Sequence, residues 1–128
     1  MHHPNEQVMR ELDEAQLKGD FEAFVNYFTD DVVVHIPGKS SLAGDYQGKD
    51  KFIDLFQRFN ERAPGYTFEP HAYLADDEHG VSLQRSTYKR GDETLQTNDA
   101  FVVHFRDGKV AEFWIVTDKS EEVDAFLG

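Results

Sequence analysis

A β-branched run at residues 32–38, Val-Val-Val-His-Ile-Pro-Gly, separates a helical part of the chain from a part rich in strands. Such a run, closed by Pro37 and Gly38, predicts a buried strand. His35 stands near the end of the run, where a polar side chain commonly faces a cavity. We therefore expect this strand to form one wall of any pocket in the protein.

Helical spacing of apolar residues dominates the chain around this strand. It extends over residues 5–18 and again over 21–28, and Gly19 and Asp20 suit the end of one helix and the start of the next. A Gly- and Ser-rich loop should follow at residues 39–48. A third helix is then expected from residue 49 or 50 to about residue 63.

Strand patterns fill the chain after residue 65. Gly-containing turns at residues 90–92 and 106–108 predict hairpins, and Pro70 predicts a sheet edge or a bulge. A last segment, residues 118–127, should contain at least one helical turn. The four expected strands are 66–75, 81–89, 93–105 and 109–117, so the pattern predicts a single α+β domain over residues 1–128.

The composition narrows the classes of function. The chain has no cysteine, which excludes disulfides, thiolate chemistry and cysteine-bound zinc. A net charge of −12 without a basic cluster argues against nucleic-acid binding. The histidines show no metal-ligand spacing, so no metal and no cofactor are expected. Without a long apolar run or a leader-like segment, the expected location is the cytoplasm, away from membranes. His2 and His3 are given no role.

Four segments together resemble the NTF2-like superfamily, in its SnoaL-like branch of polyketide cyclase and ketosteroid isomerase-like proteins. The resemblance implies a cone-shaped, cystatin-like fold with three N-terminal helices packed on a strongly curved, mostly antiparallel sheet. It also implies an apolar cavity and a homodimer formed through the convex face of the sheet. The segments are Gly-Asp-Phe-Glu-Ala-Phe at 19–24, Asp-Asp-Val-Val-Val-His-Ile-Pro-Gly at 30–38, Leu-Ala-Gly-Asp-Tyr-Gln-Gly at 42–48 and Asp-Gly-Lys-Val-Ala-Glu-Phe-Trp at 107–114.

The acids that serve the characterised relatives are replaced in this chain. In ketosteroid isomerase, an Asp base works with a Tyr and a protonated Asp. By resemblance these positions fall on Ile36, Leu12 and Phe101, and the last-strand carboxylate of other relatives falls on Ile115. Steroid isomerisation by the known mechanism is therefore not expected. A shift of one residue would put His35 rather than Ile36 at the base position, and the sequence leaves that choice open.

Three residues are the predicted catalytic set: His35, Arg85 and Asp99. An imidazole exchanges a proton near neutral pH, which makes His35 the candidate acid–base group. Arg85 shares a strand face with Val81 and Leu83, taken as the inner face, where it would need a ligand anion or Asp99 as partner. The alternatives are that His35 lies on the outer face of the sheet and that Arg85 reaches solvent.

The expected partner is a small apolar or amphipathic ligand inside the cavity. If the protein is an enzyme, we expect a cofactor-independent isomerase, cyclase or hydrolase-like activity, and the alternative is a non-catalytic ligand-binding or dimeric interaction module. Trp114 and His104 are expected on the convex face at a dimer contact. The predicted ligand-binding residues are Ile36, Tyr46, Phe56, Tyr73, Leu83, Phe101, Phe113 and Ile115.

Overall fold

The computed structural model describes residues 3–128, and His2 lies outside the described residues. The chain forms one six-stranded sheet with helices packed against it, so the predicted α+β class is confirmed. The helices are α1 (Pro4–Lys18), α2 (Phe21–Val25), α3 (Lys49–Arg62) and α4 (Ser120–Leu127). The strands are β1 (Phe28–Ile36), β2 (Gly44–Gln47), β3 (Thr67–Ala75), β4 (His79–Arg90), β5 (Glu93–Arg106) and β6 (Lys109–Thr117).

The strand order is β2-β1-β6-β5-β4-β3, with β3 to β6 forming the predicted antiparallel meander. Strand β1 pairs in parallel with β6, and the register places Val34 beside Phe113. As predicted for Pro70, β3 is an edge strand, and its register shifts between Pro70 and Ala72. The hairpin turn at Asp107 and Gly108 has positive φ at both residues, which is the usual geometry of a tight two-residue turn.

Two parts of the predicted layout are wrong. The second helical segment ends at Val25, and β1 begins at Phe28 because the backbone there pairs with Val110. The expected loop at residues 39–48 contains strand β2, which pairs with the free edge of β1. The backbone groups of β1 pair with those of β2, although the sequence of β2 carries little strand signal.

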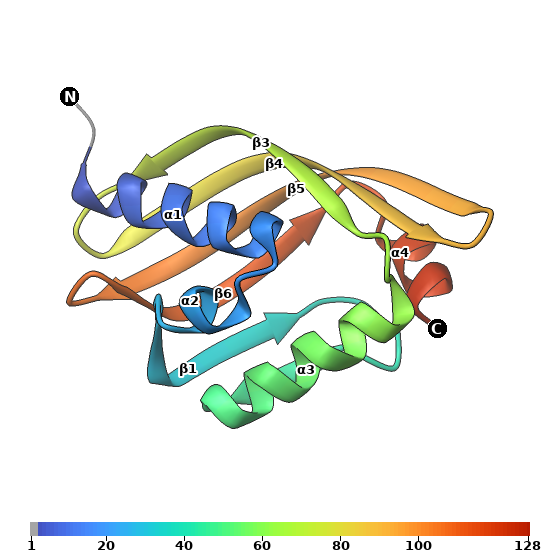
Figure 1. Cartoon of the computed structure of the whole chain (residues 1–128), viewed down its shortest axis with the longest axis horizontal. Coiled ribbons are helices and arrows are strands. Elements are labelled where there is room, and N and C mark those ends of the chain that lie inside the picture. Colours follow the sequence, from blue (N-terminus) through green and yellow to red (C-terminus); the bar gives the residue numbers. More distant parts are fainter. Residues whose placement is uncertain (1–2) are drawn as a thin grey trace.

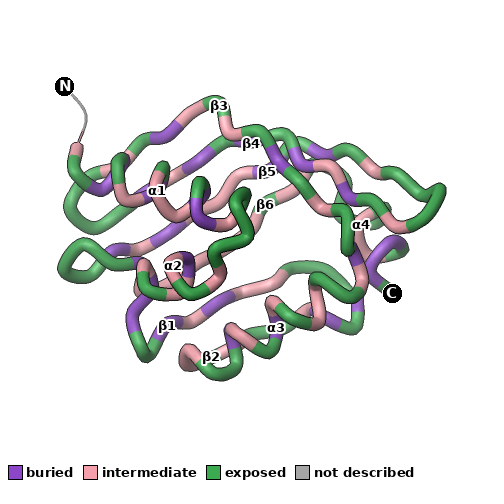
Figure 2. The backbone as a smooth tube through the Cα atoms, viewed as in Figure 1, coloured by how far each residue is buried: buried purple, intermediate pink, exposed green. Residues whose placement is uncertain are grey.

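Helices α1, α2 and α3 lie on the same side of the sheet (Figure 1). Helix α1 contacts β3 and β4, whereas α3 contacts β1 and β2. Buried positions occur along the strands, and exposed positions are frequent in the turns and along the helices (Figure 2). No helix among residues 3–128 is long and apolar enough to cross a membrane.

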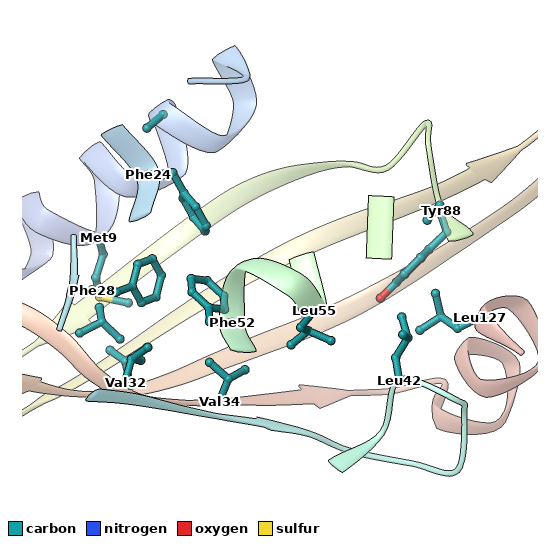
Figure 3. Packing of buried hydrophobic residues seen from close by; sticks show 14 of the residues in the cluster. Met9, Phe24, Phe28, Val32, Val34, Leu42, Phe52, Leu55, Tyr88 and Leu127 are labelled. Atoms are coloured by element: carbon teal, nitrogen blue, oxygen red, sulfur yellow. The ribbon is translucent and has the colours of Figure 1, made fainter. Parts of the chain in front are cut away.

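A cluster of aromatic rings joins the helices to the sheet (Figure 3). The ring of Phe28 lies 5.1 Å from that of Phe24 and 4.7 Å from that of Phe52. Val32 and Val34 of β1 are fully buried beneath these rings. Removal of this apolar surface from water is the main source of stability at this end of the molecule.

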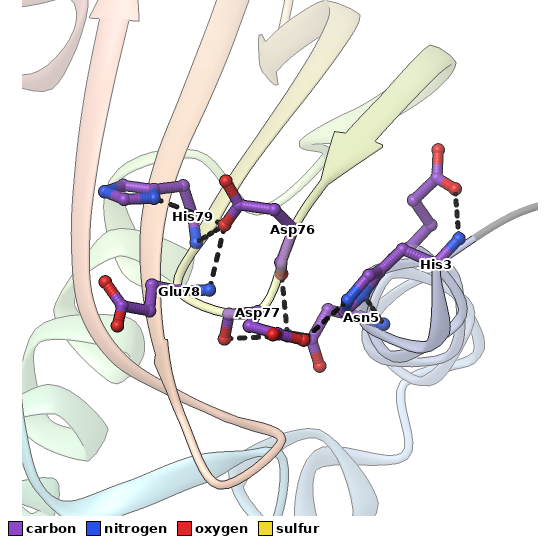
Figure 4. A network of polar contacts seen from close by, with 7 residues as sticks. His3, Asn5, Asp76, Asp77, Glu78 and His79 are labelled. Atoms are coloured by element: carbon purple, nitrogen blue, oxygen red, sulfur yellow. Dashed lines mark hydrogen bonds and ion pairs between the residues drawn. The ribbon is translucent and has the colours of Figure 1, made fainter.

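Hydrogen bonds connect the start of α1 to the turn between β3 and β4 (Figure 4). His3 caps the helix by accepting a hydrogen bond from the Asn5 backbone N–H, and its Nε2 lies 2.8 Å from Asp77 Oδ1. The Asn5 side chain donates to the carbonyl oxygens of Asp76 and Asp77. His3, for which no role was expected, therefore has a structural one.

Candidate functional site

The helices and the sheet enclose an apolar cavity of about 140 Å³. Its wall on the sheet comes from alternate residues, including Val34 and Ile36 of β1, Phe101 of β5, and Phe113 and Ile115 of β6. We call this the inner side of the sheet. A strand turns successive side chains to opposite faces, so the residues between these lie on the outer side.

Five of the eight predicted ligand-binding residues line the cavity. The rings of Phe101 and Phe113 are stacked at 5.3 Å, and Phe56 reaches the cavity from α3. The five residues are Ile36, Phe56, Phe101, Phe113 and Ile115. Their position makes the wall largely apolar, while binding of a ligand to them remains a prediction.

His35 does not face the cavity, which corrects the predicted catalytic set. Because Val34 and Ile36 point inward, His35 points outward and stacks on Trp114 with the ring centroids 5.0 Å apart. Its Nε2 lies 2.7 Å from Glu112 Oε2, and its Nδ1 lies 2.7 Å from Asp45 Oδ1. The alternative with Ile36 at the inner position is thus the one observed, and proton transfer in the cavity through His35 lacks the required geometry.

The two carboxylates raise the pKa of His35, Glu112 through the larger hydrogen-bond effect and Asp45 through the next. Charged His35 should therefore stabilise the fold below its ordinary pKa of 6.5, and this contribution should disappear as pH rises through the raised pKa. We predict that His35→Gln lowers the free energy of unfolding by about 1 kcal/mol near pH 6 and by less near pH 9. Urea unfolding at both pH values measures the difference, and an equal loss at both would contradict the prediction.

Arg85 and Leu83 also lie on the outer side of the sheet. Both are exposed, whereas Ser82, Gln84 and Ser86 between and beside them are buried. The inner-face assignment for Arg85 and Leu83 is therefore wrong by one residue. That assignment assumed that the apolar residues of β4 face inward, whereas on this strand the polar residues do. Within the described residues, Arg85 forms no ion pair with Asp99, and its partner in the β5 register is Asn98.

The two predicted tyrosines lie near the cavity but outside its wall, which corrects their assignment. Tyr46 of β2 donates to the carbonyl oxygen of Leu42 at 2.7 Å and accepts from Arg58 at 3.2 Å. Tyr73 is buried and donates from its hydroxyl to Asp13 Oδ2 at 2.6 Å. Tyr73 therefore contacts the cavity wall at Asp13.

Asp13 is a cavity residue that the sequence reasoning missed. It lines the cavity from α1, where only 6% of the residue is exposed. Burial raises the pKa of Asp13 to about 6, with the hydrogen bond from Tyr73 offsetting part of the rise. The signal in the sequence was the spacing of Met9, Leu12, Asp13 and Gln16, which follows i, i+3, i+4, i+7 and places an acid on the buried helix face.

Asp99, the third predicted catalytic residue, does line the cavity and is 4% exposed. Its Oδ2 accepts a hydrogen bond from the Ser86 hydroxyl at 2.7 Å. Ser86 in turn lies 3.1 Å from the hydroxyl of Tyr66, another cavity residue. Burial first, and then the charges of Asp99 and Asp13, raise the pKa of Tyr66, so both carboxyls act on the same ring.

Asp99 belongs to a band of buried polar residues on the inner side of the neighbouring strands β4 and β5. Gln84 of β4 is paired with Asp99 of β5, and Ser86 with Thr97. We call this band the polar stripe, and it comprises Ser82, Gln84, Ser86, Thr97 and Asp99, all at most 4% exposed. The inner side of a sheet is normally apolar, so this band is unusual, and two of its members, Ser82 and Asp99, line the cavity.

A surface depression of about 320 Å³ lies next to the cavity, between α1, α2 and α3. Gln16, Phe24, Phe56 and Tyr66 belong to the walls of both. This depression is the natural candidate for the cavity mouth. For residues 3–128, no group of three or more histidine, aspartate or glutamate side chains is arranged to hold a metal ion.

A model of the SnoaL-like domain matches residues 9–113, which is most of the chain. The chain belongs to the SnoaL-like domain family. Comparison with curated proteins gave no match. The similarity to solved structures extends over nearly the whole length of this SnoaL-like chain.

Three solved structures illustrate the fold that this SnoaL-like protein shares. Bal32a, from a soil-derived mobile gene cassette, is 24% identical, covers 98% of this chain and 97% of its own, and has a TM-score of 0.90. A protein of unknown function with a cystatin-like fold from Xanthomonas campestris is 21% identical over 100% and 99% of the two chains, also with a TM-score of 0.90. TerC, co-crystallised with polyporic acid, is 15% identical over 98% and 100%, with a TM-score of 0.86. At these identities the likeness shows the fold alone.

The carboxyl side chains in the cavity of this SnoaL-like chain lie at other positions than the resemblance implies. The four positions assigned by resemblance to the acids of characterised relatives all line the cavity and are all apolar: Leu12, Ile36, Phe101 and Ile115. Asp13 follows Leu12 in α1, and Asp99 precedes Phe101 by two residues on the same side of β5. The cavity thus holds two carboxyls, supplied from neighbouring positions.

Proposed function

We propose that this protein binds a small, mostly apolar molecule in the cavity and catalyses a proton transfer on it, as an isomerase or cyclase does. The observation that carries the proposal is the presence of two buried carboxyls, Asp13 and Asp99, in an otherwise apolar wall. The relative TerC, which was co-crystallised with polyporic acid, supports the idea that this fold accommodates a small organic molecule.

Asp13 is suited to act as the general base. With a pKa of about 6, it is ionised at neutral pH yet more basic than an ordinary aspartate. The Tyr73 hydroxyl holds one of its oxygens at 2.6 Å and so fixes the orientation of the carboxylate. Neither Asp13 nor Asp99 forms an ion pair within residues 3–128, so no paired cation occupies the oxygen that would accept a substrate proton.

Asp99 is suited to orient the ligand. The Ser86 hydroxyl holds its Oδ2, and Gln84 and Tyr66 support Ser86. Side chains fixed in this way hold a ligand group in place at little additional entropic cost, which favours a reactive geometry. In this arrangement Asp13 abstracts the proton and Asp99 positions the molecule that carries it.

The ring opening of 5-nitrobenzisoxazole tests the proposed base without knowledge of the natural substrate. A carboxylate removes the proton at C3 while the N–O bond breaks, and the product is a coloured cyanophenolate. We expect the wild-type rate to rise with pH through about 6 and then level off, because only ionised Asp13 accepts the proton. Asp13→Asn should lower the rate by about a hundredfold.

Two variants serve as controls for this measurement. Glu14→Gln changes the next residue of α1, which is exposed, and should leave the rate unchanged. His35→Gln should also leave it unchanged, because His35 points away from the cavity. A rate that depends on His35 but not on Asp13 would refute the assignment of the base.

The second candidate function is a non-catalytic ligand-binding or dimeric interaction module. The apolar residues at the four expected acid positions favour it, as does the outer side of the sheet, where Val116 is 56% exposed and Leu83 38%. Under this alternative, 5-nitrobenzisoxazole would open at the same rate with wild type and Asp13→Asn. Light scattering would then show a particle larger than the 14.7 kDa chain if the outer side joins two copies.

A further inference from the structure

The side-chain hydrogen bonds of Gln84, Tyr66 and Ser86 form a series in which the last acceptor is Asp99. Gln84 Nε2 donates to Tyr66 Oη at 3.2 Å and to Ser86 Oγ at 3.0 Å. Ser86 has a single hydroxyl proton and gives it to Asp99 Oδ2, so the hydroxyl of Tyr66 donates to Ser86. Each of these donors is thereby engaged, and the series of bonds ends on one carboxylate oxygen.

The other oxygen of the same carboxylate, Asp99 Oδ1, is buried and has no hydrogen-bond partner among residues 3–128. Asp99 lies in the cavity wall, whereas Ser86 does not. Ser86 thus occupies Oδ2, and within the described part of the chain Oδ1 is left without a protein partner in a residue of the cavity wall, as are Gln84 Oε1 and Thr97 Oγ1 of the same stripe. A buried carboxylate oxygen without a donor costs stability, so this arrangement is not explained by the needs of the fold.

We propose that Asp99 Oδ1 accepts a hydrogen bond from a hydroxyl group on an apolar ring, which makes the ligand class of this cavity phenol-like. The inference rests on the proposed function and adds to it the chemical group that the site recognises. A hydroxyl offers one proton to the one open oxygen of Asp99. An ammonium group would bring three donors, and a positive charge, into a wall that is mostly apolar.

The size and surface of the cavity fit a single ring. Its volume of about 140 Å³ is close to the ~150 Å³ of an apolar protein cavity that binds benzene. The stacked rings of Phe101 and Phe113 offer aromatic surface on the same side of β5 as Asp99. A ring in contact with these two residues lies beside the carboxylate.

Phenol and toluene test the inference because they differ only by a hydroxyl in place of a methyl group. The isotope-labelled full-length chain is titrated with each compound, and the amide shifts of cavity residues in two-dimensional NMR spectra report binding. Toluene is the more apolar and would bind more tightly to a purely apolar cavity. We expect phenol to bind at least about tenfold more tightly than toluene, as a hydrogen bond to a charged group provides.

Asp99→Asn should abolish that preference, because the amide offers donors where the carboxylate had only acceptors. Toluene affinity should change by less than about threefold, since the shape of the side chain is retained. Asp92→Asn, in the exposed turn after β4, is the matched control and should keep the wild-type preference. If Asp99→Asn does not fold, the comparison of phenol with toluene in the wild type still shows whether the cavity prefers a hydroxyl group.

The contrary results are distinct. Binding of toluene as tightly as phenol overturns the inference but leaves the proposed cavity function in place. Tighter binding of benzylamine than of phenol overturns the hydroxyl assignment in favour of a cation. A preference for phenol that survives in Asp99→Asn removes Asp99 from the recognition site. Absence of binding by all three compounds contradicts the proposed function together with the inference.

Discussion

The free energy of unfolding of the wild-type chain should fall by about 2–3 kcal/mol more than that of Asp13→Asn between pH 4 and pH 8. Burial raises the pKa of Asp13 from 3.8 to about 6, so the folded chain holds this proton at pH values where the unfolded chain has lost it. The protonated form favours folding. Stability from this group is therefore highest at low pH and is lost as pH rises through the window from about 4 to 6.

Urea unfolding of both proteins across this pH range measures the effect. The comparison is between the changes in the free energy of unfolding with pH. Any effect of the asparagine amide that is the same at every pH therefore cancels. Parallel curves for wild type and Asp13→Asn would show that Asp13 titrates normally, and the proposed base would lose its elevated pKa. The expected result would mean that an acid which weakens the fold at neutral pH is retained there, as is typical of functional groups.

Phe28→Ala should lower the free energy of unfolding by about 3–5 kcal/mol. Phe28 is 2% exposed, and its ring packs between those of Phe24 and Phe52 at the start of β1. Its removal takes apolar surface out of the core and leaves a space that the neighbouring rings cannot fill without moving. Chemical denaturation followed by circular dichroism measures the loss.

Leu17→Ala is the control for this substitution, since it also shortens a large apolar side chain but at a site that is 48% exposed. Its cost should stay below about 1 kcal/mol. Equal losses for the two variants would contradict the packing assigned to the aromatic cluster.

The order of helices and strands was predictable because it depends on local signals. Gly91, Asp107 and Gly108 adopt positive φ in the tight turns that the sequence indicates. Strand β2 was not predictable, because its four residues are held by pairing with β1 rather than by their own preferences. Similarly, Phe28 joins a strand rather than a helix because Val110, distant in the chain, pairs with it.

The site was predictable only in part, since orientation within a strand changes with a shift of one residue. Phe101, Phe113 and Ile115 were placed correctly in the cavity wall, whereas the choice between His35 and Ile36 was open until the structure showed Ile36 in the wall. The same rule failed on β4, where the polar residues face inward and Arg85 outward. A rule based on hydrophobicity fails on β4 because Ser82, Gln84 and Ser86 are buried there although they are polar.

The parallel pairing of β1 with β6 has a consequence for how the protein is made. It places Val34 of β1 beside Phe113 of β6, two residues that are far apart in the chain. Contacts between distant segments form slowly because a long loop must close first. During synthesis β1 emerges before β6, so this edge of β1 has no strand to pair with until β6 has been made. The six-stranded sheet is therefore completed only after β2 to β6 have all been synthesised.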